Sequence, residues 1–575
     1  MLENLLPIRK ETIPTTLLPE PKRGIPTTPP DRRTGREPLE VMGQLPGIVA
    51  GQDTSCTSCS QAGCHTVGCP MDNNIPLINK HFDDAARLEF EASQFLDKHL
   101  SFMNWFGAAG SSLRNKVHNT FYKKRLKEAK EKRDEAPKHY RMAFDESWKT
   151  NRFGLITGLI CPSKGSLCEA SCIYTEDPIA IRGREYLIHQ KAWQNDWIPP
   201  LEQKEKLGKS IAIIGSGPGA LATAEYAFEA GYDVTIYERS SVPGGLTALG
   251  IPEHKMNYEK DVAQYYERLE KAGVKIVTNT SVGQEPTHQN TDNITLEELS
   301  KSTGKDGIVM ATGKYRPTLP VKEEKGAEHV KQAIDFLSLA SLNARIEKNP
   351  LGAFADDPTL SEKVKYYEAQ GLNMKGKRVI VIGGSDTAAD TCNVSAMRQG
   401  AQSVTHLYRG AEDRMKMDGK EKETALDAGV DFKYDVSVEH IEKNSDGSLS
   451  VTLTNREVLE CDEIISATGF GAEDLRKSFG AALPINEYGL VDVQDPIFIS
   501  GSVEKGDPTP QAGVVGLFNN GATQVPVYAV GDITGSPLAV HALAGGRDLV
   551  KEGHLVGDKA YKGNRANLPV FGMAA

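Results

Sequence analysis

One stretch, residues 209–238 (KSIAIIGSGPGALATAEYAFEAGYDVTIYE), constrains the fold more than any other part of the chain. Its apolar run Ile211–Ile214 predicts a buried parallel strand, and the glycine-rich turn that follows predicts the start of a helix. A second, β-branched strand then ends on Glu238. A strand, a Gly-x-Gly-x-x-Gly-type turn, a helix, a strand and an acid, in this order, form a dinucleotide-binding fingerprint. The alternative is an ordinary βαβ turn without a ligand, and the complete context argues against it.

The residues of this turn have separate physical roles. Glycine lets the backbone approach a pyrophosphate at the helix N-terminus, where free N–H groups and the helix dipole favour negative charge. Ala220 holds the last, helix-packing position of the motif, where a small residue suffices, and Glu238 is expected to accept hydrogen bonds from a ribose. The predicted contacts of the turn are Gly215, Gly217, Pro218, Gly219 and Ala220.

A second copy of this strand–turn–helix–strand motif begins at residue 377 (KRVIVIGGSDTAADTCNVSAMRQGAQSVTHLYRG). Its second strand ends on Arg409 and not on an acid. An acid at this position suits a ribose 2′-hydroxyl and an arginine suits a 2′-phosphate, so we expect FAD in the first fold and NADPH in the second. Ser385 replaces the middle glycine, and its Cβ could crowd the pyrophosphate. The predicted contacts here are Gly383, Gly384, Ser385, Asp386, Thr387, Arg409 and Arg414.

Further segments complete the two predicted folds. PGGLTALGIP, directly after the first acid-ending strand, contains close-approach turns and is expected to pass beneath a flavin; GIVMATG and IISATG are strands with the same Ala-Thr-Gly ending. VYAVGD predicts a strand followed by an acid that can bond a ribityl hydroxyl, and it returns to complete the FAD domain. Each segment alone could be an ordinary turn or helix cap. The residues expected to contact cofactor are Gly244, Gly245, Leu246, Thr312, Gly313, Gly469, Gly531 and Asp532.

Seven of the nine cysteines fall between positions 56 and 172. Four are spaced C-x2-C-x4-C-x4-C before Pro70, and three follow in GLICPSKGSLCEASC. Clustered thiolates indicate a metal site, and the crowding of three cysteines with a fourth before proline favours ferredoxin-type iron–sulfur ligation over zinc. Two cubane clusters need eight ligands, so the eighth comes from another residue type or one cluster is incomplete. The seven are Cys56, Cys59, Cys64, Cys69, Cys161, Cys168 and Cys172.

Length and charge bound the remaining possibilities. The chain has 575 residues, which is enough for three or more domains. A net charge of −10 argues against a nucleic-acid partner held by general electrostatics. No apolar run is long enough for a transmembrane segment, and acids and prolines interrupt the N-terminus where a secretory signal needs an apolar core. A cytoplasmic enzyme is therefore expected.

Two segments lie outside these modules. Residues 1–50, rich in Pro, Thr and charge, are expected to form an extended N-terminal arm or to be disordered. The insertion at about 95–150 begins apolar and becomes basic, which predicts a solvated helix with an apolar inner side, or a surface that docks an acidic protein or a membrane. The predicted domains are 1–50 (arm), 51–205 (helical, two 4Fe–4S clusters), 206–325 (FAD, first part), 326–490 (NAD(P)H) and 491–575 (FAD, second part).

From about Cys56 to its end, the chain resembles the small (β) subunit of bacterial glutamate synthase and its relatives. These include the N-terminal part of dihydropyrimidine dehydrogenase and the large subunit of NADH-dependent ferredoxin–NADP oxidoreductases. The stretches that carry the resemblance are the cysteine groups, IIGSGPGALA, PGGLTALGIPEHKM, ATG, VIGGSDTAAD with RQGAQSVTHLYR, and ATGF with AVGD and GGR. The resemblance implies an α/β fold with two Rossmann-like nucleotide-binding domains of the glutathione/thioredoxin reductase type, preceded by a helical iron–sulfur domain.

The resemblance also implies a function. In that family NADPH reduces FAD, and electrons pass through two 4Fe–4S clusters to a partner, which would be the glutamate synthase large subunit, a ferredoxin or another redox protein. No glutaminase nucleophile or FMN barrel is present, so the chain is not expected to make glutamate alone. A stand-alone NAD(P)H:ferredoxin-type reductase is one alternative. A cluster-bearing assembly or sensory protein with a vestigial NADPH site, suggested by Ser385, is another.

The family's ligation pattern maps onto this sequence with some departures. One cluster would use Cys56, Cys59, Cys64 and Cys172, and the other Cys69, Cys161 and Cys168 with a non-cysteine ligand. The resemblance places that ligand at Glu185, which could equally be a surface glutamate of a helix. The spacing before Cys69 is one residue longer than in the family, the second cysteine group is stretched, and the arm and the insertion have no family counterpart.

Overall fold

The computed structural model of the chain describes most of the sequence after residue 68. The described residues are 64, 69–105, 123–161, 167–172, 179–253, 255–283, 292–314, 316–348, 364–365, 368–369, 371–471, 475–480, 482–497, 512–535, 538–551 and 569–572. They belong to two compact units, divided at Pro200, which we call the helical unit and the sheet unit. The predicted arm, Cys56 and Cys59 lie outside the described residues.

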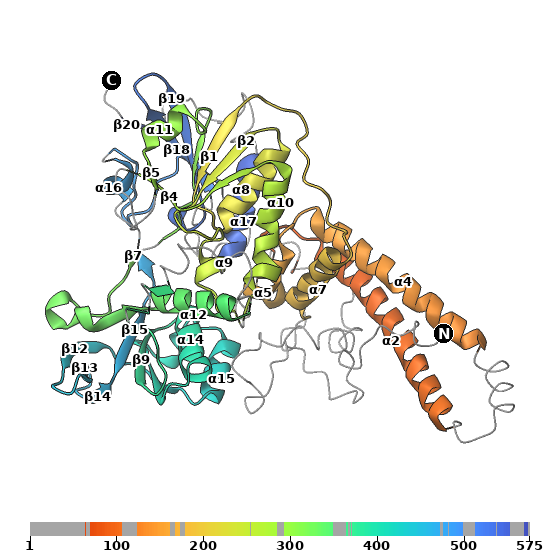
Figure 1. The fold of residues 1–575 in the computed structure, drawn as a ribbon, viewed down its shortest axis with the longest axis horizontal. Helices are drawn as coiled ribbons and strands as arrows, with labels where there is room; N and C mark the ends of the chain where they lie inside the picture. The colour runs from red at the N-terminus through yellow and green to blue at the C-terminus, as the bar shows by residue number, and fades with distance from the viewer. Residues whose placement is uncertain are drawn as a thin grey trace. The chain divides into compact units, whose positions relative to one another are not determined.

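The helical unit is built on a long hairpin of two helices (Figure 1, orange). Phe82 and Tyr140, one from each helix, stack edge to face at 5.5 Å, and Leu187 of a third helix joins the same buried cluster. The second helix of the hairpin buries its apolar side while Lys124 and Lys127 stay exposed. The helices are α2 (Ile75–Trp105), α4 (Lys123–Trp148), α5 (Gly154–Ile160), α6 (Leu167–Ala170) and α7 (Ile181–Gln194).

The first sheet of the sheet unit has eight strands, in the order β17-β18-β19-β6-β1-β2-β3, with β20 beside β18. Strands β3, β2, β1, β6 and β19 run parallel, so the C-terminal part of the chain returns to the sheet begun by β1. The strands are β1 (Ser210–Ile214), β2 (Asp233–Tyr237), β3 (Lys275–Val277), β6 (Ile308–Met310), β17 (Asp495–Ile497), β18 (Ala512–Asn519), β19 (Gln524–Val530) and β20 (Val570–Gly572).

Helices cover this sheet, and α8 and α17 also pack against each other. Because both faces are covered, the parallel strands are continuous apolar runs, and four of the five residues of β1 are buried. The helices and minor elements around the sheet are α8 (Pro218–Glu229), α9 (Leu246–Leu249), η6 (Glu259–Ala263), α10 (Gln264–Ala272), β4 (Thr280–Val282), β5 (Asp292–Ile294), α11 (Leu296–Lys301), α16 (Leu475–Phe479), η11 (Gly531–Thr534) and α17 (Ala539–Lys551).

The second sheet is entirely parallel, in the order β11-β10-β9-β15-β8, and α12 and α14 pack against it. Its elements are η7 (Glu323–Lys325), η8 (Ala327–His329), β8 (Val330–Gln332), α12 (Ala333–Lys348), β9 (Arg378–Gly383), α14 (Asp386–Asn393), η9 (Val394–Arg398), β10 (Ser403–Leu407), η10 (Glu412–Arg414), α15 (Gly419–Asp427), β11 (Asp431–Lys433) and β15 (Glu463–Ala467). A three-stranded antiparallel sheet follows β11: β12 (Val438–Lys443), β13 (Leu449–Leu453) and β14 (Val458–Cys461).

The two chain segments that connect these sheets run side by side. The segment that leaves the first sheet forms β7 (Arg316–Pro317), and it pairs with β16 (Phe470–Gly471), which follows the last strand of the second sheet. Thr318 N–H donates to the Gly469 carbonyl at 3.0 Å and extends this contact. The second sheet is therefore an insertion within the first fold. The covered parallel strands of the two sheets confirm the predicted α/β class.

None of the helices that the structure describes combines the length and the apolar character that a membrane-spanning helix needs.

Candidate functional site

The first glycine-rich turn lies at the carboxyl end of β1, the central strand of the first sheet. Gly215 has φ +96°, and a Cβ there would lie 2.5 Å from the Ala311 carbonyl oxygen, so only glycine fits. Gly217 caps α8, with Pro218 as the first helical residue, and a Cβ on Gly217 would meet no atom within 4 Å. The helix N-terminus is thus left open on the side where the fingerprint predicts a pyrophosphate.

Glu238, the acid at the end of the second strand, is buried and belongs to a polar network with the turn. Ser216 Oγ donates to its carboxylate, and the Ser240 N–H donates to the other carboxylate oxygen at 2.7 Å. Ser216 Oγ in turn accepts from the Gly244 N–H at 2.9 Å. The buried Tyr266 hydroxyl donates to the Ser216 carbonyl. The fingerprint turn, the acid and the Gly244-Gly245 loop are therefore fixed as one assembly.

Two more predicted residues lie at the same edge of the first sheet. Strands β1, β6 and β19 are parallel neighbours, so the segments that follow them leave at one edge. Thr312 follows β6, and its Oγ1 is buried without a hydrogen-bond partner among the described residues. Asp532 follows β19, and burial raises its pKa to about 6, although the nearby Lys314 opposes the shift. An orphaned hydroxyl and a desolvated carboxyl are groups that a polar ligand would satisfy.

Several of the glycines predicted to contact cofactor have positive φ angles, a conformation that favours glycine. Gly244 and Gly245 have φ +128° and +56°, and Gly245 caps α9, whose first residue is the predicted contact Leu246. Gly531 has φ +81° at the start of η11. Gly313 of the first Ala-Thr-Gly ending has φ +73°, and Gly469 of the second has φ +99°.

The second turn repeats the first one in its backbone contacts. A Cβ at Gly383 would lie 2.5 Å from the Ala467 carbonyl oxygen, the equivalent of the contact in the first fold. A Cβ at Gly384 would meet the Tyr408 ring at 2.3 Å. Ser385 has φ −121° and ψ 175°, an extended conformation open to any residue, so serine at this position causes no backbone strain. It caps α14, which begins with the predicted contacts Asp386 and Thr387.

The charged residues predicted beside the second turn divide into two sorts. Asp386 Oδ1 accepts from the Asp418 N–H at 2.7 Å, and burial raises the pKa of Asp386. Arg409 and Arg414, which follow β10, are exposed, and Arg414 lies 3.8 Å from the exposed Asp435. Asp386 thus holds its own fold together, whereas the two arginines present charge to solvent.

Lys255, which the sequence does not single out, joins the two folds of the sheet unit. It follows the Gly-Ile-Pro loop of the first fold, and its Nζ lies 3.4 Å from Asp390 of α14 and 3.1 Å from Glu421 of α15. Burial lowers its pKa, but the two carboxylates outweigh this effect and raise the pKa above its ordinary value. Burial also raises the pKa of Asp390. The loop after α9 is therefore tied to the helix that begins at the second turn.

Four of the described cysteines lie together in the helical unit, whereas Cys392 and Cys461 are buried in the sheet unit. Cys64, Cys69, Cys168 and Cys172 pack against an apolar cluster that contains Ile75. Cys161 follows α5, and the charges of Glu185 and Cys69 act on it. Burial, with help from Glu185, raises the pKa of Cys161 far above its ordinary value. A metal cation beside such a thiol would favour its ionised form.

Glu185 is not an exposed surface glutamate, which was the alternative that the sequence left open. Its carboxylate accepts hydrogen bonds from Asn73 Nδ2 at 2.6 Å, Asn151 Nδ2 at 2.8 Å and Thr157 Oγ1 at 2.7 Å. Burial raises its pKa against the effect of these three donors. The carboxylate therefore joins α7 to α5 and to the segment before α2, next to Cys161.

Comparisons with known proteins support the same reading. A sequence model of the pyridine nucleotide-disulphide oxidoreductases matches residues 209–546. The glutamate synthase [NADPH] small chain of Azospirillum brasilense is 30% identical over 455 residues, which cover 74% of this chain and 82% of that protein. The glutamate synthase [NADPH] small chain of Escherichia coli (strain K12) is 31% identical over 418 residues, with coverages of 70% and 81%. The glutamate synthase [NADH] of Schizosaccharomyces pombe is 30% identical over 445 residues, 72% of this chain but 19% of that protein.

Two nucleotide folds with repeated turns, together with these matches, define the class: an NAD(P)H-dependent flavin oxidoreductase. The chain belongs to the pyridine nucleotide-disulphide oxidoreductase family and, within it, to the glutamate synthase small chains. The resemblance inferred from the sequence is therefore confirmed.

Proposed function

We propose that the chain is the electron-transfer subunit of a redox system, which takes electrons from NADPH and passes them through FAD and two 4Fe–4S clusters to a partner protein. The observation that carries the proposal is that a cysteine-rich region with a half-buried carboxylate accompanies two nucleotide folds in one chain. FAD converts a two-electron hydride donor into a source of single electrons, which is what iron–sulfur clusters accept.

The first fold is the proposed FAD site and the second the proposed NADPH site. Buried Glu238 offers a carboxylate for ribose hydroxyls, whereas the exposed Arg409 and Arg414 offer charge to a 2′-phosphate. The unpartnered hydroxyl of Thr312 and the protonatable carboxyl of Asp532 fit the polar part of a flavin nucleotide. The ion pairs of Lys255 would hold the NADPH helix α14 to the loop beneath the flavin.

The cysteine-rich region is the proposed cluster site. We propose Cys56, Cys59, Cys64 and Cys172 as ligands of one cluster, and Cys69, Cys161 and Cys168 with Glu185 as ligands of the other. Support comes from the packing of the described cysteines on one apolar cluster and from the effect of Glu185 on Cys161. The apolar surroundings would limit solvent access to the clusters and so tune their potentials.

The proposed partner is a large catalytic subunit, because the curated relatives are named small chains of glutamate synthase. In the fission yeast relative the matching part is about a fifth of a much longer glutamate synthase [NADH], 19% of its length. A ferredoxin is the alternative partner. A cluster-bearing assembly or sensory protein with a vestigial NADPH site is a further alternative; the backbone of Ser385 itself carries no strain. The cytoplasm is the proposed location.

Anaerobic purification and cofactor analysis test the proposal. We expect about eight iron and eight acid-labile sulfide per chain, as two 4Fe–4S clusters require. We also expect one FAD per chain and bleaching of its absorbance by NADPH, followed by the electron paramagnetic resonance signals of reduced clusters. Zinc in place of iron would overturn the cluster assignment, and a flavin that NADPH does not reduce would favour the vestigial site.

Nucleotide preference provides a second test. Arg409→Ser should raise the KM for NADPH by about 10–100-fold, because a charge-assisted hydrogen bond contributes about 1.5–3 kcal/mol. The KM for NADH should stay the same. Arg456→Ser, which removes an exposed arginine from the antiparallel sheet, is the matched control. Equal changes for NADPH and NADH would remove Arg409 from the 2′-phosphate site.

A further inference from the structure

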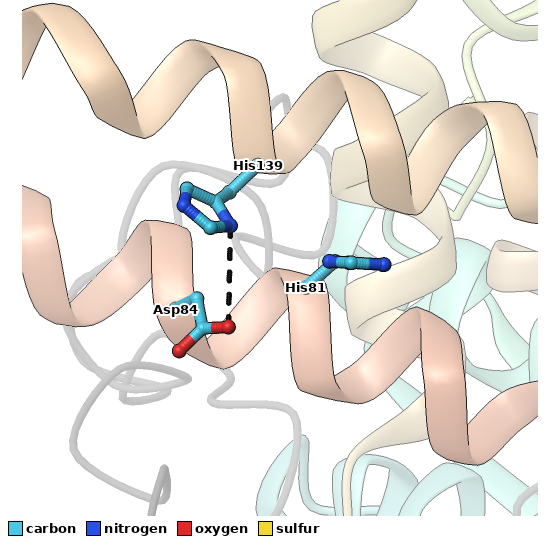
Figure 2. Close-up of side chains that lie close together, drawn as sticks. All are labelled: His81, Asp84 and His139. Atoms are coloured by element: carbon cyan, nitrogen blue, oxygen red, sulfur yellow. Dashed lines mark ion pairs between the residues drawn. The ribbon is translucent and has the colours of Figure 1, made fainter.

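A cluster of two histidines and one aspartate lies on the helical hairpin, among residues that the proposed electron path does not use. His81 and Asp84 are three residues apart on α2, and His139 faces them from α4 (Figure 2). One potential ligand atom from each of the three residues lies within 4.8 Å of the other two. Positions i and i+3 of a helix share one face, so both groups of α2 point to the same side.

The contacts within this cluster leave ligand atoms unused. His139 Nδ1 lies 3.9 Å from Asp84 Oδ2, which is too far for a hydrogen bond. Neither His81 Nδ1 nor His139 Nδ1 has a hydrogen-bond partner in the described part of the chain, although both atoms are buried. The other oxygen of Asp84 accepts from Arg87 at 2.7 Å. Two buried ring nitrogens without partners are costly, and each needs a donor, a water molecule or a metal ion.

We propose that His81, Asp84 and His139 bind a divalent transition-metal ion such as Zn²⁺. Imidazole nitrogen and carboxylate oxygen are ordinary zinc ligands, and three protein ligands with an open fourth position are a familiar set. Ligands about 2.1 Å from a tetrahedral ion lie about 3.4 Å apart, so side-chain rotation must bring these atoms closer by at most roughly 1.4 Å. The side chains of Asp84 and His139 are about a quarter exposed, at 27% and 25%, which leaves room for entry and for a water ligand.

The surroundings support the same proposal. The helices near the cluster are held by two contacts: Tyr140 of α4 donates to Glu89 of α2 at 3.0 Å, and Arg184 of α7 pairs with Asp83 of α2 at 2.8 Å. The helices therefore hold the three ligands near each other without the ion, and the ion would cross-link α2 to α4.

Metal binding to the full-length holoprotein tests this proposal. Zn²⁺ is titrated in competition with a fluorescent chelator, after exposed metal has been removed with EDTA. We expect the wild type to bind one more Zn²⁺ than His139→Gln, or to bind it at least about tenfold more tightly, because even changes outside the ligand shell cost about 10–100-fold. His440→Gln, at an exposed histidine beside Glu442, should bind Zn²⁺ like the wild type.

A second variant and a second readout separate this site from the cysteines. Asp84→Asn keeps the shape of the side chain and should weaken the same Zn²⁺. Zn²⁺ should also slow hydrogen exchange in α2 and α4 of the wild type and have no such effect in either variant. Equal stoichiometry and affinity in the wild type and both variants, or unchanged exchange in the hairpin of the wild type, would overturn the proposal. Neither result depends on the flavin or on the clusters.

Discussion

At the scale of single residues, the fold itself requires Gly215 of the first turn, whereas at Gly217 we propose that the ligand does. Gly215 cannot carry a Cβ, because the Ala311 carbonyl oxygen occupies that place. At Gly217 a Cβ would meet nothing in the described structure. We therefore expect Gly217→Ala to leave the fold intact and to weaken FAD binding by at least about tenfold, or about 1.4 kcal/mol. Flavin fluorescence during reconstitution of the apoprotein measures the affinity.

Gly419→Ala is the matched control for this variant, because Gly419 at the start of α15 also has open space around a Cβ. It should keep the wild-type FAD affinity. If Gly217→Ala also bound FAD like the wild type, the pyrophosphate would lie elsewhere.

Lys255 gives a second prediction at this scale. Lys255→Met would leave Asp390 and Glu421 without their cation, and breaking such a buried pair costs about 3–5 kcal/mol. We expect lower resistance to urea and slower flavin reduction by NADPH, while the FAD content stays the same. Lys271→Met, which removes an exposed pair with Glu267, should change stability by about 0–1 kcal/mol. A Lys255→Met protein with wild-type flavin reduction would show that the link does not position NADPH.

The sequence predicted which residues are candidate ligand contacts better than it predicted the hydrogen-bond partners of the site residues. Glu238 and Arg409 follow from their places at strand ends, because strand periodicity fixes where each strand stops. The backbone of Ser385 carries no strain, but the expected crowding of the pyrophosphate by its Cβ depends on where the ligand lies, which spacing does not give. The three donors to Glu185 come from positions up to 112 residues away, and a local pattern contains no information about them.

At the scale of elements, a buried imidazole of α7 packs against α5 and contacts α4. His189 Nε2 lies 3.0 Å from Ser147 Oγ, and a Cβ on Gly154 would lie 2.2 Å from the ring. Burial lowers the pKa of His189 to about 3. Below pH 6.5 the unfolded chain therefore binds a proton at this histidine, whereas the folded chain does not. The contribution of neutral His189 to the free energy of unfolding is therefore complete above pH 6.5 and decreases as the pH falls towards 3.

The expected slope is about 1.4 kcal/mol per pH unit between pH 6 and 4. His189→Gln should have a shallower slope over this range, even if it is less stable at pH 7. Hydrogen exchange of α5 and α7, corrected for its intrinsic pH dependence, measures the local stability. His440→Gln, at an exposed histidine, should keep the wild-type slope. Parallel slopes in the wild type and His189→Gln would mean that the ring is protonated without unfolding.

Elements with an internal signal were predictable from the sequence, and those defined by distant contacts were not. Strands β1 and β9 are apolar runs followed by glycine turns, so both were predicted with their places in the fold. The insertion predicted a basic helix, and α4 has exposed lysines as expected. Nothing local showed that α4 would return along α2 and bring His139 beside Asp84, because that pairing depends on residues more than fifty positions apart.

At the scale of the whole molecule, the division at Pro200 separates the proposed cysteine ligands from both nucleotide folds. Every strand of the two parallel sheets lies after this division, and the C-terminal strands complete the first sheet. A fragment of residues 200–575 therefore contains the complete cores of both folds. We expect it to fold alone, to bind FAD and to lack iron.

This fragment separates hydride transfer from electron delivery. It should reduce a two-electron dye with NADPH at a rate within about threefold of the full chain, a change of about 0.7 kcal/mol in barrier. Its reduction of a ferredoxin should fall by at least about 100-fold, because single electrons would no longer pass through the clusters. Stopped-flow absorbance measures both, with the full chain as the control. If the fragment reduced ferredoxin at the full rate, the flavin would reach the acceptor directly, and the cysteine-rich unit would have a different task.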